Sequence, residues 1–127
     1  MFEIGINDEF EAAHALKGDF GPATRLHGHT YRVEVRVEAE RLDSTGTFYD
    51  LGKLRADLKA VLGDMHYRNL DELDGLAGLN STVEIVAYHI FKRMEPEVRK
   101  ARVTSLKVTV WESSAVFASY RESFLSE

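Results

Sequence analysis

Three histidines have the side-chain type and the spacing that metal binding requires: His14, and the pair His27 and His29 on either side of Gly28. The whole chain has five histidines, so three in such positions are informative. Because alternate side chains of a strand point to the same face, a His-x-His pair on an extended segment presents both imidazoles together. A third histidine from a neighbouring strand would complete three neutral ligands and leave a fourth position open, which is typical of catalytic zinc.

The spacing alone leaves a second interpretation open, an ordinary surface pair, because short motifs often match by chance. The neighbouring residues favour metal binding. Small residues leave space around the three rings: Ala12, Ala13, Ala15 and Gly28. The other two histidines, His66 and His89, have no such neighbours.

The composition restricts the class of protein. A chain of 127 residues that is 44% hydrophobic is expected to fold as a single domain, 1–127, around its own core. A net charge of −5 without a long Lys/Arg cluster argues against a nucleic-acid-binding surface. No segment is long and apolar enough to span a membrane, and the first residues lack a signal-peptide pattern, so a cytoplasmic location is the default expectation.

The chain contains no cysteine. Disulfides, thiolate metal ligands and cysteine nucleophiles are therefore excluded. Any metal must be held by histidines and carboxylates.

Alternating hydrophobicity predicts strands near both ends of the chain. In 31–39, apolar side chains alternate with charged ones, as in a strand with one buried face. The same alternation extended backwards places His27 and His29 on the buried face, and the segment 2–14 places His14 on a buried face as well. Two further strands are expected at 103–112 and 115–121.

Two helices are expected between the strand pairs. Asp50 is suited to cap a helix that ends near Leu62, and Ser81 is suited to begin a second one, with Glu84 completing a capping box. The order strand–strand–helix–helix–strand–strand predicts an α+β fold, in which an antiparallel four-stranded sheet carries both helices on one face.

Glu112 follows an apolar stripe formed by Leu106, Val108 and Val110. If the strand continues, the carboxylate points inward, which is costly unless it is paired or used. If the strand ends at Trp111, Glu112 is merely solvated. The sequence leaves both interpretations open.

These motifs resemble the 6-pyruvoyl-tetrahydropterin synthase and 6-carboxy-tetrahydropterin synthase family, which has the tunnelling fold. The resemblance covers essentially the whole chain and rests on five segments: 10–14, 25–31, 49–50, 80–84 and 111–113. It implies the same ββααββ order. It also implies a homo-oligomer of two stacked trimers, with each pocket formed between subunits.

The resemblance further implies roles for particular residues. His14, His27 and His29 would hold Zn2+, Glu112 would accept hydrogen bonds from the pterin ring, and Thr82 would line the pocket. The substrate it implies is 7,8-dihydroneopterin triphosphate, which loses triphosphate after a base removes a side-chain proton. The expected partner is therefore a small-molecule pterin, and neither nucleic acid nor a membrane.

The family's proton-transfer residues differ in this chain. The usual base is a cysteine four residues before the His-Gly-His motif, where this chain has Ala23. The usual Asp-His pair falls on His66 and Tyr67 in one register, and on Asp64 and Met65 in the other. We favour the first register because it needs no gap near residue 69, and a His-Tyr pair can both donate and accept protons. The alternative is that both side chains simply pack against the loop.

Several functions follow from this pattern. The leading expectation is a zinc-dependent lyase that acts on the side chain of 7,8-dihydroneopterin triphosphate or a relative, in a queuosine, folate-type or biopterin-type route. Some family members without the cysteine use a nearby acid to cleave dihydroneopterin to 6-hydroxymethyl-dihydropterin, and here only Asp19 is available. The remaining alternatives are a non-catalytic zinc- and pterin-binding oligomer, and an oligomer whose metal is purely structural.

Overall fold

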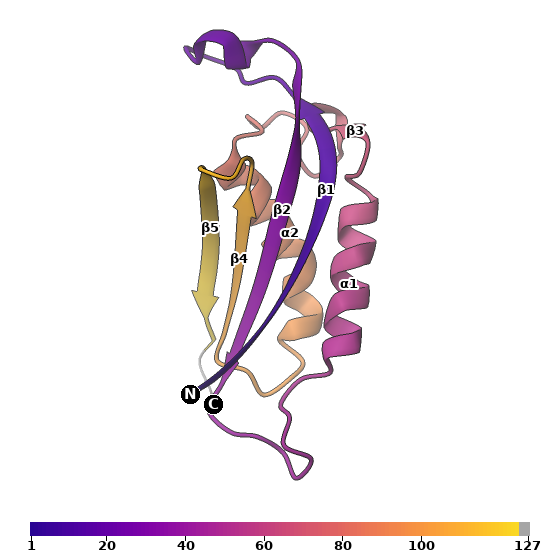
Figure 1. The fold of residues 1–127 in the computed structure, drawn as a ribbon, viewed down its shortest axis with the longest axis vertical. Coiled ribbons are helices and arrows are strands. Elements are labelled where there is room, and N and C mark those ends of the chain that lie inside the picture. Colours follow the sequence, from indigo (N-terminus) through magenta and orange to yellow (C-terminus); the bar gives the residue numbers. More distant parts are fainter. Residues whose placement is uncertain (125–127) are drawn as a thin grey trace.

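The computed structural model describes residues 1–124 (Figure 1). The described strands are β1 (Phe2–His14), β2 (His27–Ala39), β3 (Arg68–Asn69), β4 (Ser105–Trp111) and β5 (Phe117–Ser123). The α-helices are α1 (Leu51–Gly63) and α2 (Val83–Val98), and the 3-10 helices are η1 (Gly21–Thr24) and η2 (Leu70–Glu72). The predicted α+β class is confirmed.

The sheet has the strand order β3-β1-β2-β4-β5, and every neighbouring pair is antiparallel except β3 with β1. The four predicted antiparallel strands are present, and the short parallel strand β3 adds a fifth to the sheet. The two residues of β3 pair with Ala12 and Ala13 at the outer edge of β1. So short a segment has no alternation from which it could be predicted.

The hairpin of β1 and β2 determines where the three histidines lie. Its pairing is continuous from Phe2 opposite Ala39 to His14 opposite His27. Since side chains alternate along β2, His29 lies on the same face as His27. The hairpin thus brings all three imidazoles to one end of the molecule, beneath the long loop that carries η1 (Figure 1).

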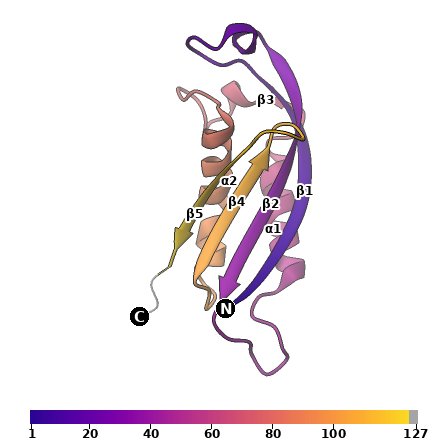
Figure 2. The same cartoon turned by 60° about the vertical axis from the view of Figure 1, so that its left-hand side comes forward.

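Both α-helices cover one face of the sheet, as predicted, and Figure 2 shows them behind it. The core lies between these layers and is formed by inward side chains of the strands and the apolar stripes of the helices. Its fully buried members include Val33, Val35, Val37, Leu54, Val86, Ile90, Leu106, Val108 and Val110. This packing supports the ends of β1 and β2 that carry the histidines. Within residues 1–124, no helix has the length and apolar character needed to cross a membrane.

Asp50 caps α1 as predicted, because its Oδ1 accepts a hydrogen bond from Lys53 N at 3.0 Å. The change Asp50→Ala leaves that N–H without its side-chain acceptor. We expect it to lower the free energy of unfolding by about 1 kcal/mol, measured by urea denaturation. The exposed loop residue Asp74 provides the control, since Asp74→Ala should cost less than about 0.5 kcal/mol. Equal losses in both variants would contradict the capping role.

Candidate metal centre

The three histidines meet where β1 ends and β2 begins. Their candidate ligand nitrogens all lie within 4.8 Å of one another, and their ring centroids are 4.6 to 5.1 Å apart. His14 is buried, whereas His27 and His29 are half-buried. The cluster therefore offers three nitrogen donors that could hold one metal ion.

Hydrogen bonds determine which ring nitrogens are free. His14 Nδ1 lies 2.8 Å from the carbonyl oxygen of Ser81, and His27 Nδ1 lies 2.7 Å from that of Arg25. A carbonyl oxygen can only accept, so each Nδ1 carries the proton and each Nε2 keeps a lone pair. His14 Nε2 is buried without a hydrogen-bond partner among the described residues. A metal ion would satisfy that nitrogen, so the donor set fits the metal that the resemblance implies.

The surroundings of His29 favour its neutral form. Burial lowers the pKa of His29 from its ordinary value, although the carboxylate of Glu112 acts in the opposite direction. The neutral imidazole is the form that binds metals. Burial also raises the pKa of Tyr31, whose ring lies 5.3 Å from that of His29. A raised pKa keeps the Tyr31 hydroxyl protonated and uncharged. A metal ion bound by the histidines would therefore be the largest local charge.

Glu112 directly follows β4 and approaches the cluster. Its Oε2 lies 4.0 Å from His29 Nε2, and its backbone N–H donates to the carbonyl oxygen of Val116 at 3.1 Å. A cavity of about 520 Å³ adjoins both side chains, which is within the usual range for small-molecule sites. Its lining comprises Gly28, His29, Thr30, Arg32, Trp111, Glu112, Ser113 and Ser114. A hydrogen-bond acceptor and a candidate metal ligand therefore border one cavity.

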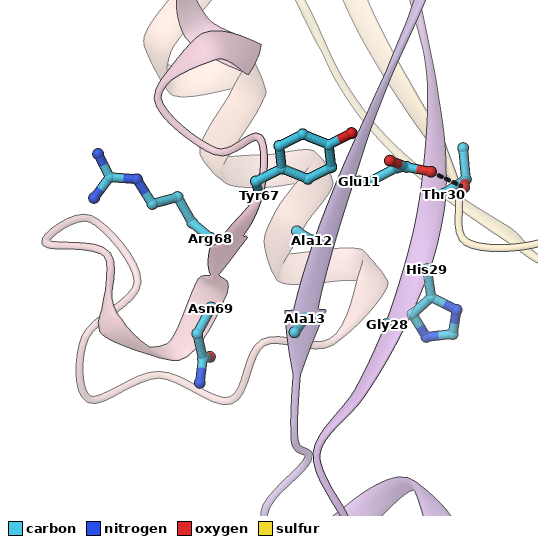
Figure 3. Close-up of a pocket in the computed structure, with 9 residues that line it drawn as sticks. All are labelled: Glu11, Ala12, Ala13, Gly28, His29, Thr30, Tyr67, Arg68 and Asn69. Carbon is cyan, nitrogen blue, oxygen red and sulfur yellow. Dashed lines mark hydrogen bonds between the residues drawn. The ribbon is translucent and has the colours of Figure 1, made fainter.

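His66 and Tyr67 lie beside β1, away from β2. His66 Nδ1 accepts a hydrogen bond from the backbone N–H of Glu11 at 3.0 Å, and its ring stacks on that of Tyr67 at 3.9 Å. Tyr67 is 78% exposed and has a φ of 58°, which is uncommon for a bulky residue. Figure 3 shows Tyr67 on one side of β1 and His29 on the other. Both residues line an open groove of about 510 Å³. Tyr67 thus shares a groove with His29, whereas the hydrogen bond and ring contact of His66 are with Glu11 and Tyr67.

The loop between β1 and β2 contains Ala23, at the position of the family's cysteine. Ala23 belongs to η1, and its carbonyl oxygen accepts a hydrogen bond from Leu16 N at 2.9 Å. Asp19, the only acid in this loop, is exposed just before η1. A methyl group cannot transfer a proton, so this loop contributes a weaker set of candidate bases than the family's pattern would.

Two residues near the cluster were missed by sequence reasoning: Ser81 and Asp71. The prediction that Ser81 caps α2 was wrong, because Thr82 is the cap and accepts a hydrogen bond from Ile85 N at 3.3 Å. Ser81 is instead buried against His14, and its Oγ donates to Asp71 Oδ1 at 2.6 Å. Thr82, predicted to line the pocket, has its hydroxyl engaged in the cap. Ser and Thr are both among the preferred N-cap residues, and Ser is slightly favoured, so residue type alone does not identify Thr82 as the cap.

The sequence is similar to those of known proteins. The family model described as 6-pyruvoyl tetrahydropterin synthase matches residues 3–123. A Synechocystis 6-carboxy-5,6,7,8-tetrahydropterin synthase is 39% identical over 98 residues, which cover 75% of this chain and 76% of that protein. A Pyrococcus furiosus dihydroneopterin monophosphate aldolase is 31% identical over 105 residues, covering 83% and 84%.

The fold matches as well. The structure of the Caenorhabditis elegans 6-pyruvoyl tetrahydropterin synthase superposes with a TM-score of 0.83 at 29% identity, over 95% of both chains. The family model spans nearly the whole described chain, and the matching relatives are enzymes that act on pterins. This chain therefore belongs to the 6-pyruvoyl tetrahydropterin synthase family.

Proposed function

We propose that this protein is a zinc-dependent lyase that acts on the side chain of 7,8-dihydroneopterin triphosphate or a closely related dihydropterin. One observation carries the proposal: His29, a member of the three-histidine cluster, and Glu112 line the same cavity. Three imidazoles without any thiolate match the ligand set of catalytic zinc sites that keep one position open. Zinc, when bound, acts as a Lewis acid on a side-chain oxygen of the substrate and stabilises the charge that proton removal creates.

Glu112 is the proposed anchor for the pterin ring. A carboxylate accepts hydrogen bonds from the adjacent N–H groups of the pterin, and such charge-assisted bonds are short and directional. Glu112 Oε2 lies 4.0 Å from His29 Nε2. A single pterin could therefore place the edge of its ring against Glu112 and its side chain against the histidine cluster. Thr82 stays a proposed lining residue through its backbone and methyl group, since its hydroxyl caps α2.

His66 and Tyr67 are the proposed proton-transfer groups, acting on the site of a neighbouring subunit. Their position beyond β1 and the high exposure of Tyr67 support this arrangement. Within the described residues, β5 and most of β1 each have an edge without a strand partner, which is a template for pairing with another copy. A homo-oligomer of two stacked trimers, as the family resemblance implies, would supply that pairing.

A second candidate function is cleavage of dihydroneopterin, or its monophosphate, to 6-hydroxymethyl-dihydropterin. It is favoured by Ala23 at the position of the cysteine and by similarity to a relative named as a dihydroneopterin monophosphate aldolase. Both reactions use the same metal ligands and the same anchor. They differ in which bond of the side chain breaks.

Mass spectrometry distinguishes these functions when zinc-loaded protein is incubated with 7,8-dihydroneopterin and with its phosphates. A 6-pyruvoyl or 6-carboxy product supports the leading proposal, and a 6-hydroxymethyl product supports the second. Unchanged substrate with measurable binding indicates a pterin-binding oligomer without turnover. If chelation lowers the melting temperature and no pterin binds at all, the metal is structural and both proposals fail.

A further inference from the structure

A chain of hydrogen bonds, buried at His14 and partly buried at Asp71, connects these two residues. His14 Nδ1 lies 2.8 Å from the carbonyl oxygen of Ser81 and 3.3 Å from its Oγ. Ser81 Oγ lies 2.6 Å from Asp71 Oδ1, and Asp71 Oδ2 accepts a hydrogen bond from Ala15 N at 2.9 Å. We propose that Asp71 and Ser81 are positioning residues that orient His14 as a metal ligand and raise the metal affinity of the site. This inference rests on the metal binding contained in the proposed function.

The directions of these hydrogen bonds leave one arrangement of protons. The Ser81 carbonyl oxygen only accepts, so His14 Nδ1 must donate and Nε2 must keep its lone pair. With the Nδ1 proton facing it, Ser81 Oγ can only accept from that ring, and its own proton must turn elsewhere. The oxygen of Asp71 at 2.6 Å accepts that proton. The chain therefore selects the tautomer of His14 whose Nε2 can bind a metal.

Asp71 is itself held by three segments of the chain. Its backbone N–H donates at 3.0 Å to Oδ1 of Asn69, the residue directly before η2. Its two carboxylate oxygens contact the end of β1 through Ala15 and the residue before the α2 cap through Ser81. The carboxylate is thus fixed relative to both β1 and α2. A fixed acceptor is what a positioning role requires, because it holds the imidazole ring in one orientation.

His14 is the only one of the three ligands with such support from side chains in the described structure. His27 Nδ1 donates to the backbone carbonyl of Arg25, and this bond lies at the surface. His29 has Glu112 nearby, which the proposed function assigns to the substrate. His14 is also the one fully buried ligand, at 1% exposure. We therefore expect the Asp71–Ser81 pair to affect metal binding through His14.

The test is the zinc affinity of the variants Asp71→Asn and Ser81→Ala, measured by competition with a chromophoric chelator. Asparagine has the shape of aspartate but must turn an NH2 group toward Ser81 Oγ or toward Ala15 N, both of which donate to Asp71 in the native chain. In the first case the Ser81 hydroxyl loses its acceptor and its proton can turn toward His14 Nδ1, where it opposes the Nδ1 proton that the Ser81 carbonyl oxygen holds and so weakens the preference for the tautomer that binds through Nε2. We expect a loss of about 10- to 100-fold in zinc affinity for Asp71→Asn, the usual effect of removing such a partner.

Ser81→Ala keeps the carbonyl contact and removes only the hydroxyl, so its expected loss is smaller, roughly tenfold, at the low end of that range. The control is Glu72→Gln, which removes one charge from the same 3-10 helix at an exposed side chain. It should leave the zinc affinity unchanged. The visible absorption spectrum of the cobalt-substituted protein gives a second readout, because a reoriented His14 changes the ligand field.

The outcomes separate this inference from the proposed function. Wild-type protein that binds no zinc overturns both. If the wild type binds zinc, and both variants bind within about twofold of it with unchanged cobalt spectra, the inference alone is overturned. Melting temperatures of the metal-free variants identify a purely structural role, which would lower stability without changing zinc affinity or the cobalt spectrum. Weaker zinc binding with an altered cobalt spectrum in Asp71→Asn supports the inference.

Discussion

His27→Ala is expected to abolish stoichiometric zinc binding and, with it, turnover of the dihydropterin substrate. The change leaves two imidazoles, His14 and His29, at a site that offers no thiolate to replace the third. Three-ligand zinc sites depend on each ligand, and metal assistance is worth several kcal/mol in such reactions. A fall in turnover of about a thousandfold or more is therefore expected, since about 4 kcal/mol corresponds to that factor.

His27 is a better choice for this test than His14. His14 is buried and hydrogen-bonded to Ser81, so its removal would leave a cavity and an unpaired carbonyl group. His27 is half-buried, and its Nδ1 partner is the carbonyl of Arg25 in a surface loop. His89→Ala is the matched control, because it removes a histidine of α2 outside the cluster and should leave the metal content intact. Metal analysis and product formation are measured together, and full zinc content in His27→Ala would contradict the ligand assignment.

The candidate ligands could be found from the sequence because one local regularity, the alternation of side chains along a strand, places them. Strand alternation puts His27 and His29 on the face of Tyr31 and Val33, both of which are fully buried. The same rule puts His14 on the face of Phe10. What alternation cannot supply is the register, and it is the pairing of His14 with His27 that brings the rings within reach of one ion.

Other parts of the site could not be predicted, because they depend on contacts between distant segments. Ser81 meets His14 partly through a backbone carbonyl, a group that every residue carries and that no sequence pattern identifies. Asp71 reaches Ser81 and Ala15 only after η2 has folded against the end of β1. A polar residue in a loop has the same appearance in sequence whether it is solvated or buried in such a contact.

The placement of Tyr67 illustrates a further limit. The sequence aligns it with a catalytic position of the family, yet β3, which follows it directly, pairs with the outer edge of β1, on the side opposite the strand that carries His27 and His29. Strand order within a sheet is a property of the whole fold and not of any segment. The role of His66 and Tyr67 in proton transfer at the site of a neighbouring subunit therefore stays a proposal.

Glu112→Gln is expected to reduce the affinity for pterins while leaving zinc in place. Glutamine has nearly the shape of glutamate, but one of its two terminal groups donates hydrogen bonds. A pterin edge that presents two N–H groups would then meet one acceptor and one opposing donor. The loss of a charge-assisted bond and an unsatisfied donor cost about 2 to 3 kcal/mol, roughly a 30- to 150-fold loss in affinity.

Zinc binding should survive this change for an electrostatic reason. The Glu112 carboxylate raises the pKa of His29, whereas burial, the larger influence, lowers it. Removing the negative charge leaves burial and the neighbouring rings of His14 and His27, all of which lower this pKa, so His29 is held still more firmly in the neutral form that binds a metal. Fluorescence titration with neopterin measures the affinity, and metal analysis measures the zinc. Glu9→Gln, at an exposed carboxylate of β1, is the control. Unchanged neopterin affinity in Glu112→Gln would show that Glu112 is only a solvated acid at the end of a strand, and the pterin anchor would have to be sought elsewhere in the cavity.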